Sequence, residues 1–341
     1  MEITRVGVDT SKHVFTLHGV DASGAAVLRR DLRRGAFEVF MAKLPPTEVA
    51  LEACGGSHHW ARRLGAMGHR VRLIPPQYVK PFVKRGKTDR ADAEAICEAA
   101  GRPGMRFVPV KSAERQGEIT VLRTRELLVR QRTQLVNALR GHAAEFGLVV
   151  PVGVAQVEPL LAKVAADPAV PEVAREMLAL LGGQVERIDE QLAGIDARLL
   201  AMHKASEVSQ RLARVPGVGP ITAISLVLSV DPGQFEDGRH LAAWIGLTPR
   251  AHSSGGKQRL GGISRAGHER LRQLLVVGAT AVIRHAKRPG SRLASPWLTQ
   301  LLARKPRKLA AVALANKTAR IVWAMMARGE AYRQAPLAGA A

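Results

Sequence analysis

The sequence predicts an α/β region at the N-terminal end and an all-α region after it. Two observations carry this prediction. Residues 1–110 alternate short apolar runs of strand type with segments of helical periodicity. Residues 112–147 contain no proline and have the pattern of one long helix. Apolar residues form 46% of the 341-residue chain, so a sizeable core divided between two or three domains is expected.

The elements of the α/β region follow one another in the order βββαβαβα. We expect strands at residues 5–8, 13–20, 26–31, 48–52 and 70–74, and helices at residues 36–44, 60–67 and 89–100. A polar turn at residues 10–12 joins the first two strands. This order is that of the ribonuclease-H-like fold, which we therefore predict for this region.

The region after the long helix carries a second helical signal. Four prolines between residues 151 and 171 first interrupt the chain. A heptad pattern follows, with apolar residues spaced alternately by four and three: Leu181, Val185, Ile188, Leu192, Ile195, Leu199 and Met202. The pattern predicts an antiparallel helical pair or a coiled-coil arm, and an ordinary core helix would show the same spacing.

Residues 207–341 are predicted to be mainly helical. They begin with the glycine-rich turn VPGVGP at residues 215–220. Such a turn between helices presents backbone N–H groups to a phosphate, as in helix-hairpin-helix motifs, with Gly217 and Gly219 as the contacts. A tight turn without a ligand has the same sequence. We thus expect three parts: an α/β domain at residues 1–110, a long-helix and coiled-coil region at 111–206, and a C-terminal domain at 207–341.

The charge of the chain is strongly positive and unevenly distributed. The net charge is +22, and residues 251–341 alone hold 17 basic and 2 acidic residues. Residues 151–210 are acidic instead, with 5 basic and 9 acidic residues. A polyanion such as nucleic acid is therefore expected to bind the C-terminal region. The charge of a merely solvated basic face would be smaller.

The cysteine content and the apolar runs of the chain indicate its cellular compartment. Two cysteines exclude a disulfide framework, and a zinc site of Cys54 with His58 and His59 is a poor match because no second cysteine is near. The first residues lack a signal-peptide pattern, and the longest apolar runs are about half of a membrane span. We expect a cytoplasmic protein with no membrane partner.

Four carboxylates are placed where they can act together. Asp9 ends the first strand and Glu52 ends the fourth, while Asp89 and Asp92 lie three residues apart on one face of a helix. Taken singly, Asp89 suits a helix cap and Glu52 a surface acid. Taken together, converging carboxylates in a basic protein need a cation, and their hard oxygens suit Mg²⁺ or Mn²⁺. The sequence therefore predicts a site for metal-assisted phosphoryl chemistry.

A second candidate site is the stretch HSSGGKQRLGGIS at residues 252–264. Its adjacent serines, Ser253 and Ser254, are possible nucleophiles, and its glycines allow the backbone to approach a phosphate. The stretch is not a phosphate-binding loop of nucleotide hydrolases, because no Ser or Thr follows Lys257. Cationic side chains that would meet a phosphate are Lys257, Arg259, Arg265, Arg270 and Arg272. His252 is a candidate base or a solvated side chain.

These residues resemble a known family. The set of Asp9, Glu52, Asp89 and Asp92, with GVD at residues 7–9, LEA at 51–53 and KTDRADAEAI at 87–96, is similar to the RuvC-like domain of the DEDD insertion-sequence transposases of the IS110 family. PGVG at residues 216–219 and WIGLTPR at 244–250 resemble the family's second domain. The likeness covers nearly the whole chain, and RFVPVKS at 106–112 is most similar to the IS1111 branch.

The resemblance implies a mechanism that composition and spacing do not give. It implies DNA strand exchange in which Ser254, with Ser253 as its nearest competitor, forms a covalent phosphoserine link, supported by Mg²⁺ on the carboxylates. It also implies guidance by a non-coding bridge RNA, assembly of two dimers into a tetramer, and action at the bacterial nucleoid. Aromatic residues are only 4% of the chain, so we expect the RNA to be held by its backbone and helix shape.

Two other functions remain compatible with the sequence. A metal-dependent RuvC-like nuclease, such as a Holliday-junction resolvase, would use the same carboxylates without a covalent serine intermediate. A non-catalytic DNA-binding protein would use the basic region alone. Replacement of Ser254 by alanine separates the first function from the transposase, and metal-dependent cleavage of DNA excludes the second.

Overall fold

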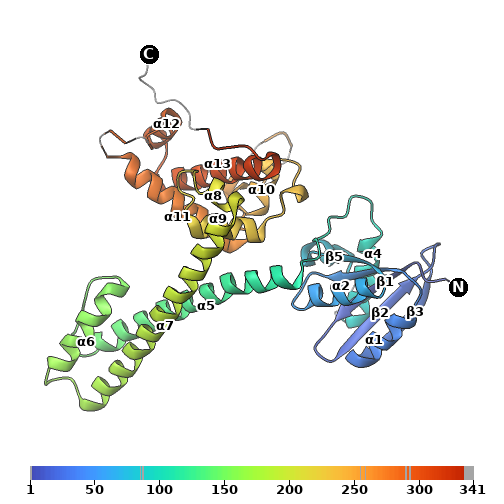
Figure 1. Ribbon diagram of the computed structural model, residues 1–341, viewed down its shortest axis with the longest axis horizontal. Helices are drawn as coiled ribbons and strands as arrows, with labels where there is room; N and C mark the ends of the chain where they lie inside the picture. Colours follow the sequence, from blue (N-terminus) through green and yellow to red (C-terminus); the bar gives the residue numbers. More distant parts are fainter. Residues whose placement is uncertain are drawn as a thin grey trace. The chain divides into compact units, whose positions relative to one another are not determined.

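The computed structural model describes residues 2–84, 86, 88–253, 255–257, 259–288, 290–291 and 293–333. The chain forms two compact units, Met1–Gly117 and Glu118–Ala341. Figure 1 shows a mixed sheet with flanking helices in the first unit and helices in nearly all of the second. The prediction that an α/β region is followed by a helical region is confirmed.

The first unit is built on one five-stranded sheet. Its strands are β1 (Arg5–Thr10), β2 (Val14–Val20), β3 (Ala26–Arg33), β4 (Glu48–Glu52) and β5 (Arg70–Ile74), arranged in the order β3-β2-β1-β4-β5. The pairs β1–β2 and β2–β3 are antiparallel, whereas β1–β4 and β4–β5 are parallel. This is the predicted ribonuclease-H-like arrangement, with β1 at the centre of the sheet.

Helices cover both faces of this sheet. Helices α1 (Arg34–Lys43) and α2 (Ser57–Ala66) pack on one face, where Phe15, Phe37 and Trp60 meet edge to face with centroids 4.7–5.2 Å apart. Helix α4 (Asp89–Ala100) packs on the other face, against β1 and β2. Successive side chains of β4 point to opposite faces of the sheet. Val49 and Leu51 therefore belong to the core under α1 and α2, and Ala50 belongs to the core under α4.

Two short elements of this unit were not predicted from the sequence. Helix α3 (Pro76–Val79) and the 3₁₀ turn η1 (Lys80–Phe82) lie between β5 and α4. They contain Pro76 and Pro81, which read as breakers in sequence but occupy first-turn positions, where proline is tolerated because its missing N–H has no helical partner there.

Three helices form an arm at the start of the second unit. The predicted long helix is α5 (Ala113–Ala144), and the heptad lies in α7 (Glu172–Ala205), with the turn η2 (Val154–Gln156) and helix α6 (Val157–Ala166) between them. Ion pairs Arg125–Asp196 and Arg132–Asp189 join α5 to α7. The heptad residues change partners along α7: Val185 packs in a core with α5 and α6, whereas Leu199 packs with α5 and α9.

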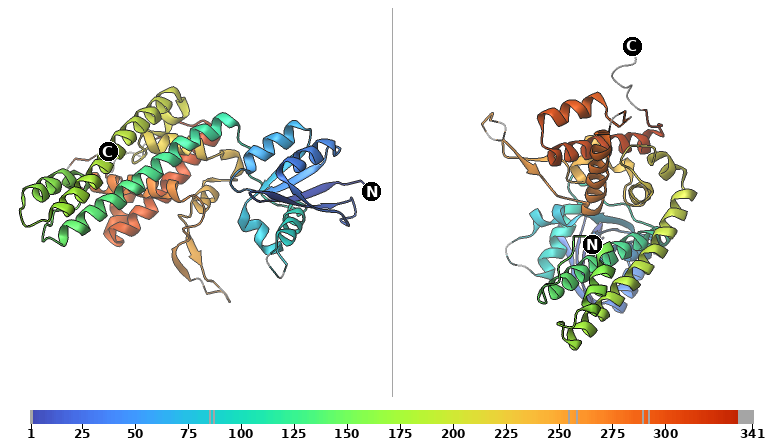
Figure 2. Two further views of the ribbon diagram at one scale, coloured as in Figure 1. Left: turned by 90° about the horizontal axis from the view of Figure 1, so that it is seen from below. Right: turned by 90° about the vertical axis from the view of Figure 1, so that its left-hand side faces the viewer.

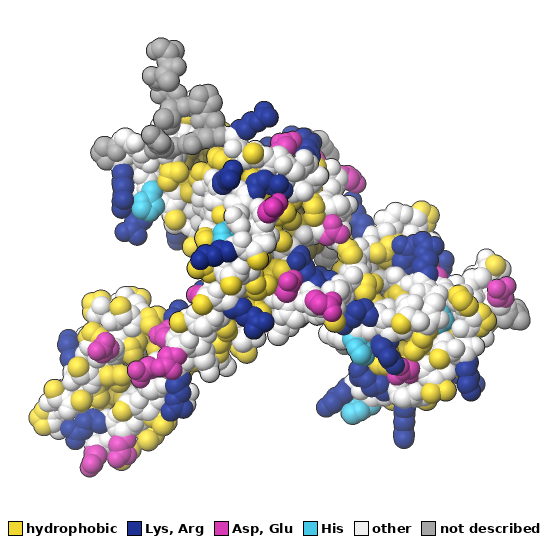
Figure 3. Space-filling view, in the orientation of Figure 1, with side chains coloured by type: hydrophobic (Ala, Val, Ile, Leu, Met, Phe, Trp, Pro, Cys, Tyr) yellow, Lys and Arg dark blue, Asp and Glu magenta, His cyan; other side chains and the backbone are white. Residues whose placement is uncertain are grey.

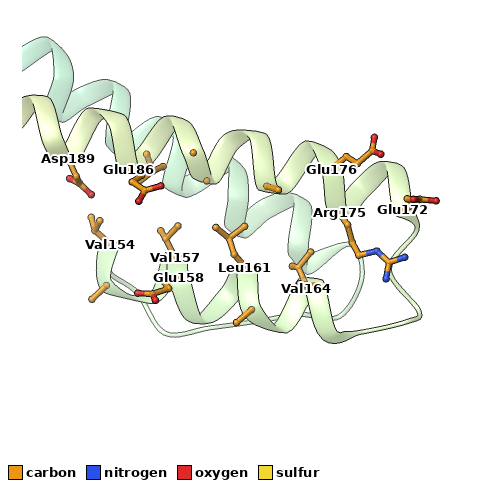
Figure 4. Close-up of a pocket in the computed structure, with 17 residues that line it drawn as sticks. Val154, Val157, Glu158, Leu161, Val164, Glu172, Arg175, Glu176, Glu186 and Asp189 are labelled. Carbon is orange, nitrogen blue, oxygen red and sulfur yellow. The ribbon is translucent and has the colours of Figure 1, made fainter.

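An apolar groove of about 1190 Å³ runs between α6 and α7. Figure 4 shows Val157, Leu161 and Val164 pointing from α6 toward α7. The rim is mainly acidic, with Glu158, Glu172, Glu176, Glu186 and Asp189 beside the single Arg175. The acidic stretch predicted from composition therefore includes this part of the arm, where Figure 3 shows several acidic side chains on the surface.

The remaining helices form a bundle with a protruding β-ribbon. The elements are α8 (Glu207–Leu212), α9 (Pro220–Ser229), η3 (Pro232–Gln234), α10 (Gly238–Trp244), β6 (Pro249–Ala251), β7 (Leu260–Ile263), α11 (Glu269–Ala286), α12 (Pro296–Arg304) and α13 (Arg307–Arg328). Strands β6 and β7 pair antiparallel, and both views of Figure 2 show their ribbon projecting from the helices. Within the glycine-rich stretch 252–264, residues 260–263 form β7, a strand that was not predicted.

Helix α13 is the centre of the bundle. It is long and apolar enough to cross a membrane by length and composition alone, with a mean hydropathy of 1.2. It packs against α10 and α11, and its buried side chains include Ala315, Ala319 and Val322. These contacts identify α13 as a core helix.

Candidate active site

The sheet register brings Asp9 and Glu52 to adjacent positions. Strands β1 and β4 run parallel, with Val8 paired to Leu51. Asp9 and Glu52 are the next residues on the two strands, so both carboxylates leave the sheet at the carboxyl ends of neighbouring strands. Both residues are half-buried.

Helix α4 is held unusually close to this part of the sheet because residue 7 is a glycine. A Cβ atom on Gly7 would lie 2.3 Å from the carbonyl oxygen of Ala93 and 2.5 Å from the backbone nitrogen of Cys97. The backbone of α4 therefore lies directly on β1. Asp89 and Asp92 occupy the first turn of α4, which Thr88 caps by accepting a hydrogen bond from the Ala91 N–H at 3.2 Å.

Electrostatic interactions connect the four carboxylates. Burial is the largest cause that raises the pKa of Asp9, followed by the charges of Asp89, Asp92 and Glu52. Together, and against a backbone hydrogen bond from Thr10 that lowers it, they bring this pKa to about 6. Burial, followed by the charge of Asp92, also raises the pKa of Glu52. Clustered carboxylates of this kind lose repulsion when a cation binds among them.

The donor set suits a hard divalent cation. All four side chains offer carboxylate oxygens, the ligands preferred by Mg²⁺ and Mn²⁺. Among the described residues, no three His, Cys, Asp or Glu side chains are close enough to form a ready-made metal cluster. The charges of the other carboxylates nevertheless raise the pKa of Asp9, and the charge of Asp92 raises that of Glu52.

A hydrogen-bonded chain that the sequence did not reveal fixes the start of α4. Arg90, between the two aspartates, donates from Nη2 to Asp31 Oδ2 on β3 at 2.9 Å. Asp31 Oδ1 accepts from the Thr16 hydroxyl on β2, also at 2.9 Å. Both bonds lower the pKa of Asp31, with Arg90 the larger cause. These residues are scattered over three elements, so only their shared position in the fold connects them.

The alternative zinc ligands of the first unit have other partners. The Cys54 thiol shares a hydrogen bond with the Thr10 hydroxyl at 3.4 Å. The Nδ1 atom of His58 accepts from the Lys111 N–H at 3.1 Å, while Arg62 donates to the Lys111 carbonyl. His58 and Arg62, one turn apart on α2, thus hold the backbone just ahead of α5.

The predicted nucleophile of the second unit belongs to the stretch 252–264, of which the β6–β7 ribbon includes the described residues. Ser254 is outside the described residues. Its neighbour Ser253 is described, and its hydroxyl accepts a hydrogen bond from the Arg259 N–H at 3.2 Å. The ribbon also joins the His252 N–H to the Arg259 carbonyl at 2.8 Å. Lys257 and Arg259 are both exposed on it, where a phosphate can reach them.

The base of the ribbon is tightly packed. Gly246 and Gly267 have positive φ, and a Cβ on Gly267 would lie 1.7 Å from the Trp244 carbonyl oxygen. Arg265 has φ of 55°, a left-handed conformation that costs energy for a residue with a side chain. Arg272 donates from Nη1 to the carbonyl oxygens of Ile245 and Ala266, each at 2.8 Å. This arrangement, which we call the ribbon clasp (Gly246, Arg265, Gly267 and Arg272), fixes the direction of the ribbon.

The other predicted phosphate contacts have structural neighbours. Burial lowers the pKa of Arg270, and the adjacent charge of Arg125 on α5 lowers it further. Gly217 has φ of 85°, and a Cβ there would lie 2.9 Å from the Gly278 carbonyl oxygen on α11. Gly219 is exposed and its Cβ position is open. The turn between α8 and α9 therefore packs on α11 through Gly217, and its other glycine, Gly219, faces solvent.

Two of these structural roles had a signal in the sequence. Gly7 interrupts an otherwise apolar strand, which indicates a close approach of backbone. Thr88 directly precedes two acidic residues of a first helical turn, which is the pattern of a cap. Asp31, Thr16 and the left-handed Arg265 had no such signal, because each depends on a neighbour distant in sequence.

Comparison with known proteins gives matches over nearly the whole chain. Residues 209–294 match the transposase IS116/IS110/IS902 family, and residues 6–146 match a transposase family of the DEDD, IS110 type. The chain is 54% identical to a putative transposase, y4pF/y4sB, of Sinorhizobium fredii over 98% of this chain and 87% of that protein. It is 43% identical to the transposase for insertion sequence element IS1111A of Coxiella burnetii, over 97% and 92% of the two chains. It is 37% identical to the transposase for element IS1328 of Yersinia enterocolitica, over 97% and 98%.

Proposed function

The chain belongs to the IS110/IS1111 family of DEDD transposases and is thus an enzyme of insertion-sequence mobilisation, and we propose that it works by serine-mediated strand exchange at a metal-assisted site. The family implies a divalent metal ion. We assign it to Asp9, Glu52, Asp89 and Asp92, with Mg²⁺ or Mn²⁺ as the ion. One observation carries this assignment: Asp9 has a pKa of about 6 because of burial and the three other carboxylates.

Ser254 is the proposed nucleophile. Its Oγ forms a bond to the phosphorus of a DNA phosphodiester, the bond to one sugar oxygen breaks, and the serine proton leaves to a base, for which His252 is the nearest histidine in sequence. The released sugar hydroxyl, or one from another strand, reverses the step and frees the serine. The phosphodiester bond energy is conserved, so rejoining needs no nucleotide cofactor. A cation at the carboxylates supplies stabilisation of the charge that develops on the phosphate oxygens.

The test uses three single-residue variants of the full chain. Ser254→Ala is expected to abolish both strand transfer and the detergent-resistant protein–DNA adduct. Ser253→Ala is the matched control, one residue away, and is expected to retain both. Asp9→Asn is expected to lose strand transfer in Mg²⁺. If Ser254→Ala still cleaves DNA, the protein acts as a RuvC-like nuclease or junction resolvase, and the serine mechanism is wrong.

The residues proposed to contact nucleic acid fall into two groups, those that are exposed and those that already have structural contacts. Lys257 and Arg259 are exposed on the ribbon, and Gly219 presents an open backbone at the N-terminus of α9, so a helix-hairpin-helix role rests on Gly219. Arg265 and Arg272 belong to the ribbon clasp, and Arg270 lies beside Arg125. Each of these three arginines already has a structural role, so the proposal requires that the same side chain also contacts a phosphate.

The proposal includes a guide RNA and an assembly. A non-coding bridge RNA pairs with donor and target DNA, two dimers form the active tetramer, and the enzyme acts in the cytoplasm at the nucleoid. The excess of basic residues supports a polyanionic partner held largely by its backbone. Purification of the full chain from cells that carry the complete element, followed by sequencing of the retained RNA, tests this. Recovery of only random cellular RNA would contradict it.

The three-part division of the chain also belongs to this proposal. We assign catalysis by carboxylates to residues 1–110, assembly to the arm at residues 111–206, and the nucleophile to residues 207–341. Limited proteolysis tests the assignment, because cleavage is expected first near the predicted boundaries.

A further inference from the structure

A shallow hollow of about 570 Å³ lies on the first unit, away from the carboxylate cluster. Its walls come from two segments on either side of α4, the turn of α3 and η1 before it and the loop after it. The lining side chains include Tyr78, Phe82, Arg102, Pro103, Met105 and Arg106. We propose that this hollow binds an unpaired nucleotide of single-stranded nucleic acid, with the base stacked on its aromatic rings.

The aromatic rings are held in place from one side. Tyr78, Phe82 and Met105 pack on a buried core that includes Val79, Ile96 and Ala99. All three are half-buried, so each keeps a part exposed to solvent. A ring that is packed on one side and open on the other is a rigid platform for a base. Because folding already orders this side chain, binding a base costs little further conformational entropy.

Aromatic residues gather at this hollow although they form only 4% of the chain. The whole sequence holds 2 Tyr and 7 Phe. One of those tyrosines and one of those phenylalanines line this hollow, and Phe107 packs on the same core. The low aromatic content predicted that RNA is held by its backbone and helix shape, whereas this hollow brings aromatic side chains together from separate segments.

Arginine supplies both the second stacking surface and the charge. The guanidinium carbon of Arg102 lies 5.5 Å from the centroid of Phe82, and Arg102 also pairs with Glu98 one turn earlier on α4. A base entering the hollow can stack on the exposed part of the Phe82 ring or on the outer face of the Arg102 guanidinium, since both groups stack on nucleobases. None of the described residues that line the hollow is acidic, which disfavours a cationic ligand.

The surroundings fit a strand that continues beyond the hollow. The described residues between 80 and 90 include the basic Lys80, Lys84 and Arg90 and one acidic residue. All three basic side chains are exposed, although Lys84 pairs with Glu94 and Arg90 with Asp31. A backbone that leaves the hollow toward these side chains meets positive charge. The hollow is open, since Arg102, Pro103, Gly104 and Arg106 are exposed, and therefore suits part of a polymer better than an enclosed small metabolite.

The test measures binding of the full chain to short labelled oligouridylate, oligothymidylate and a DNA duplex. EDTA is present throughout, so the result is independent of the carboxylate mechanism. Phe82→Leu keeps the apolar packing and removes the ring. It is expected to weaken single-strand binding about fivefold to tenfold, the loss of one base–aromatic stack, and to change duplex binding less than about twofold. Arg102→Gln is expected to act in the same direction.

The matched control is a second arginine–phenylalanine pair on the same unit. The guanidinium carbon of Arg30 lies 5.3 Å from the centroid of Phe40, which is half-buried and far from the hollow in sequence. Phe40→Leu is expected to leave single-strand binding unchanged. If Phe82→Leu and Phe40→Leu behave alike, or if duplex binding falls as much as single-strand binding, the proposal is wrong.

Photocrosslinking identifies the source of the nucleotide. Thio-substituted oligouridylate and oligothymidylate are irradiated with the full chain, and the labelled peptides are mapped by mass spectrometry. A crosslink to Tyr78 or Phe82 from the RNA alone assigns the hollow to RNA, one from the DNA alone assigns it to a displaced DNA strand, and both support a general single-strand site. Absence of crosslinks at residues 76–82 and 102–106 with either strand overturns the proposal.

Discussion

At the residue scale, the charged form of Asp9 that would bind a metal ion lowers the stability of the metal-free protein. Its carboxyl group has a pKa of about 6 in the folded chain, above the usual unfolded value of about 3.9. A raised folded pKa contributes stability that is fully present below the unfolded pKa and is lost as the pH rises through about 6. At neutral pH, the metal-free protein therefore bears the full repulsion among its carboxylates.

Asp9→Asn is expected to raise the thermal stability of the metal-free protein at pH 7.5, by about 2–5 °C. The gain should shrink toward pH 4.5, where the wild-type group is protonated. The measurement is the melting temperature in EDTA across this pH range. Asp21→Asn is the control of opposite sign, because hydrogen bonds from Ser23 lower the pKa of Asp21, so its loss is expected to be destabilising at neutral pH. Equal behaviour of the two variants would contradict this account.

Gly7 is the residue on which the position of α4 depends. An alanine Cβ would press against backbone atoms of Ala93 and Cys97 at 2.3–2.5 Å, and backbone cannot yield as a flexible side chain does. Gly7→Ala is expected to destabilise the protein by about 1–3 kcal/mol and to displace Asp89 and Asp92. Urea unfolding and the Mg²⁺-induced rise in melting temperature measure the two effects. Gly35→Ala, in helix α1 where the Cβ meets nothing within 4 Å, should not destabilise the protein and should leave the Mg²⁺-induced rise unchanged.

At the scale of elements, the ribbon clasp controls the β6–β7 ribbon. Arg272→Met removes two hydrogen bonds to carbonyl oxygens and is expected to cost about 1–3 kcal/mol. The ribbon should then be cut faster by trypsin in limited proteolysis, because its base is no longer fixed. Arg284→Gln, on an exposed position of the same helix, is the matched control and should leave the cleavage rate unchanged.

The elements also show what local sequence can and cannot predict. The strands of the first unit were predictable because apolar runs, turns and a change of period mark each of them, and their order fixed where Asp9 and Glu52 would lie. The heptad of α7 predicted a helix, but Val185 and Leu199 pack in different cores. Periodicity reports that a face is buried and carries no information about the partner. The ribbon was missed because LGGI at residues 260–263 has two glycines, which are poor strand formers.

At the scale of the whole molecule, charge divides the chain into parts that attract and repel nucleic acid. Lys257→Gln with Arg259→Gln is expected to reduce the slope of log Kd against log salt for duplex DNA by about 2, the number of phosphate contacts removed. Fluorescence anisotropy at several salt concentrations measures the slope. Arg175→Gln, on the acidic rim of the α6–α7 groove, is the control and should leave it unchanged. An unchanged slope in the double variant would show that the ribbon does not contact phosphate.

The central position of α13 has a consequence for synthesis of the enzyme. Translation proceeds from the N-terminus at about 5–20 residues per second, so the first unit can fold while the rest is still being made. The core formed by α10 and α11 stays uncovered until Arg307–Arg328 has left the ribosome. A chain that stops early therefore holds a complete carboxylate domain beside an open apolar core, which makes it a target for chaperones and proteases. Only a finished copy of the protein has a closed core in its second unit.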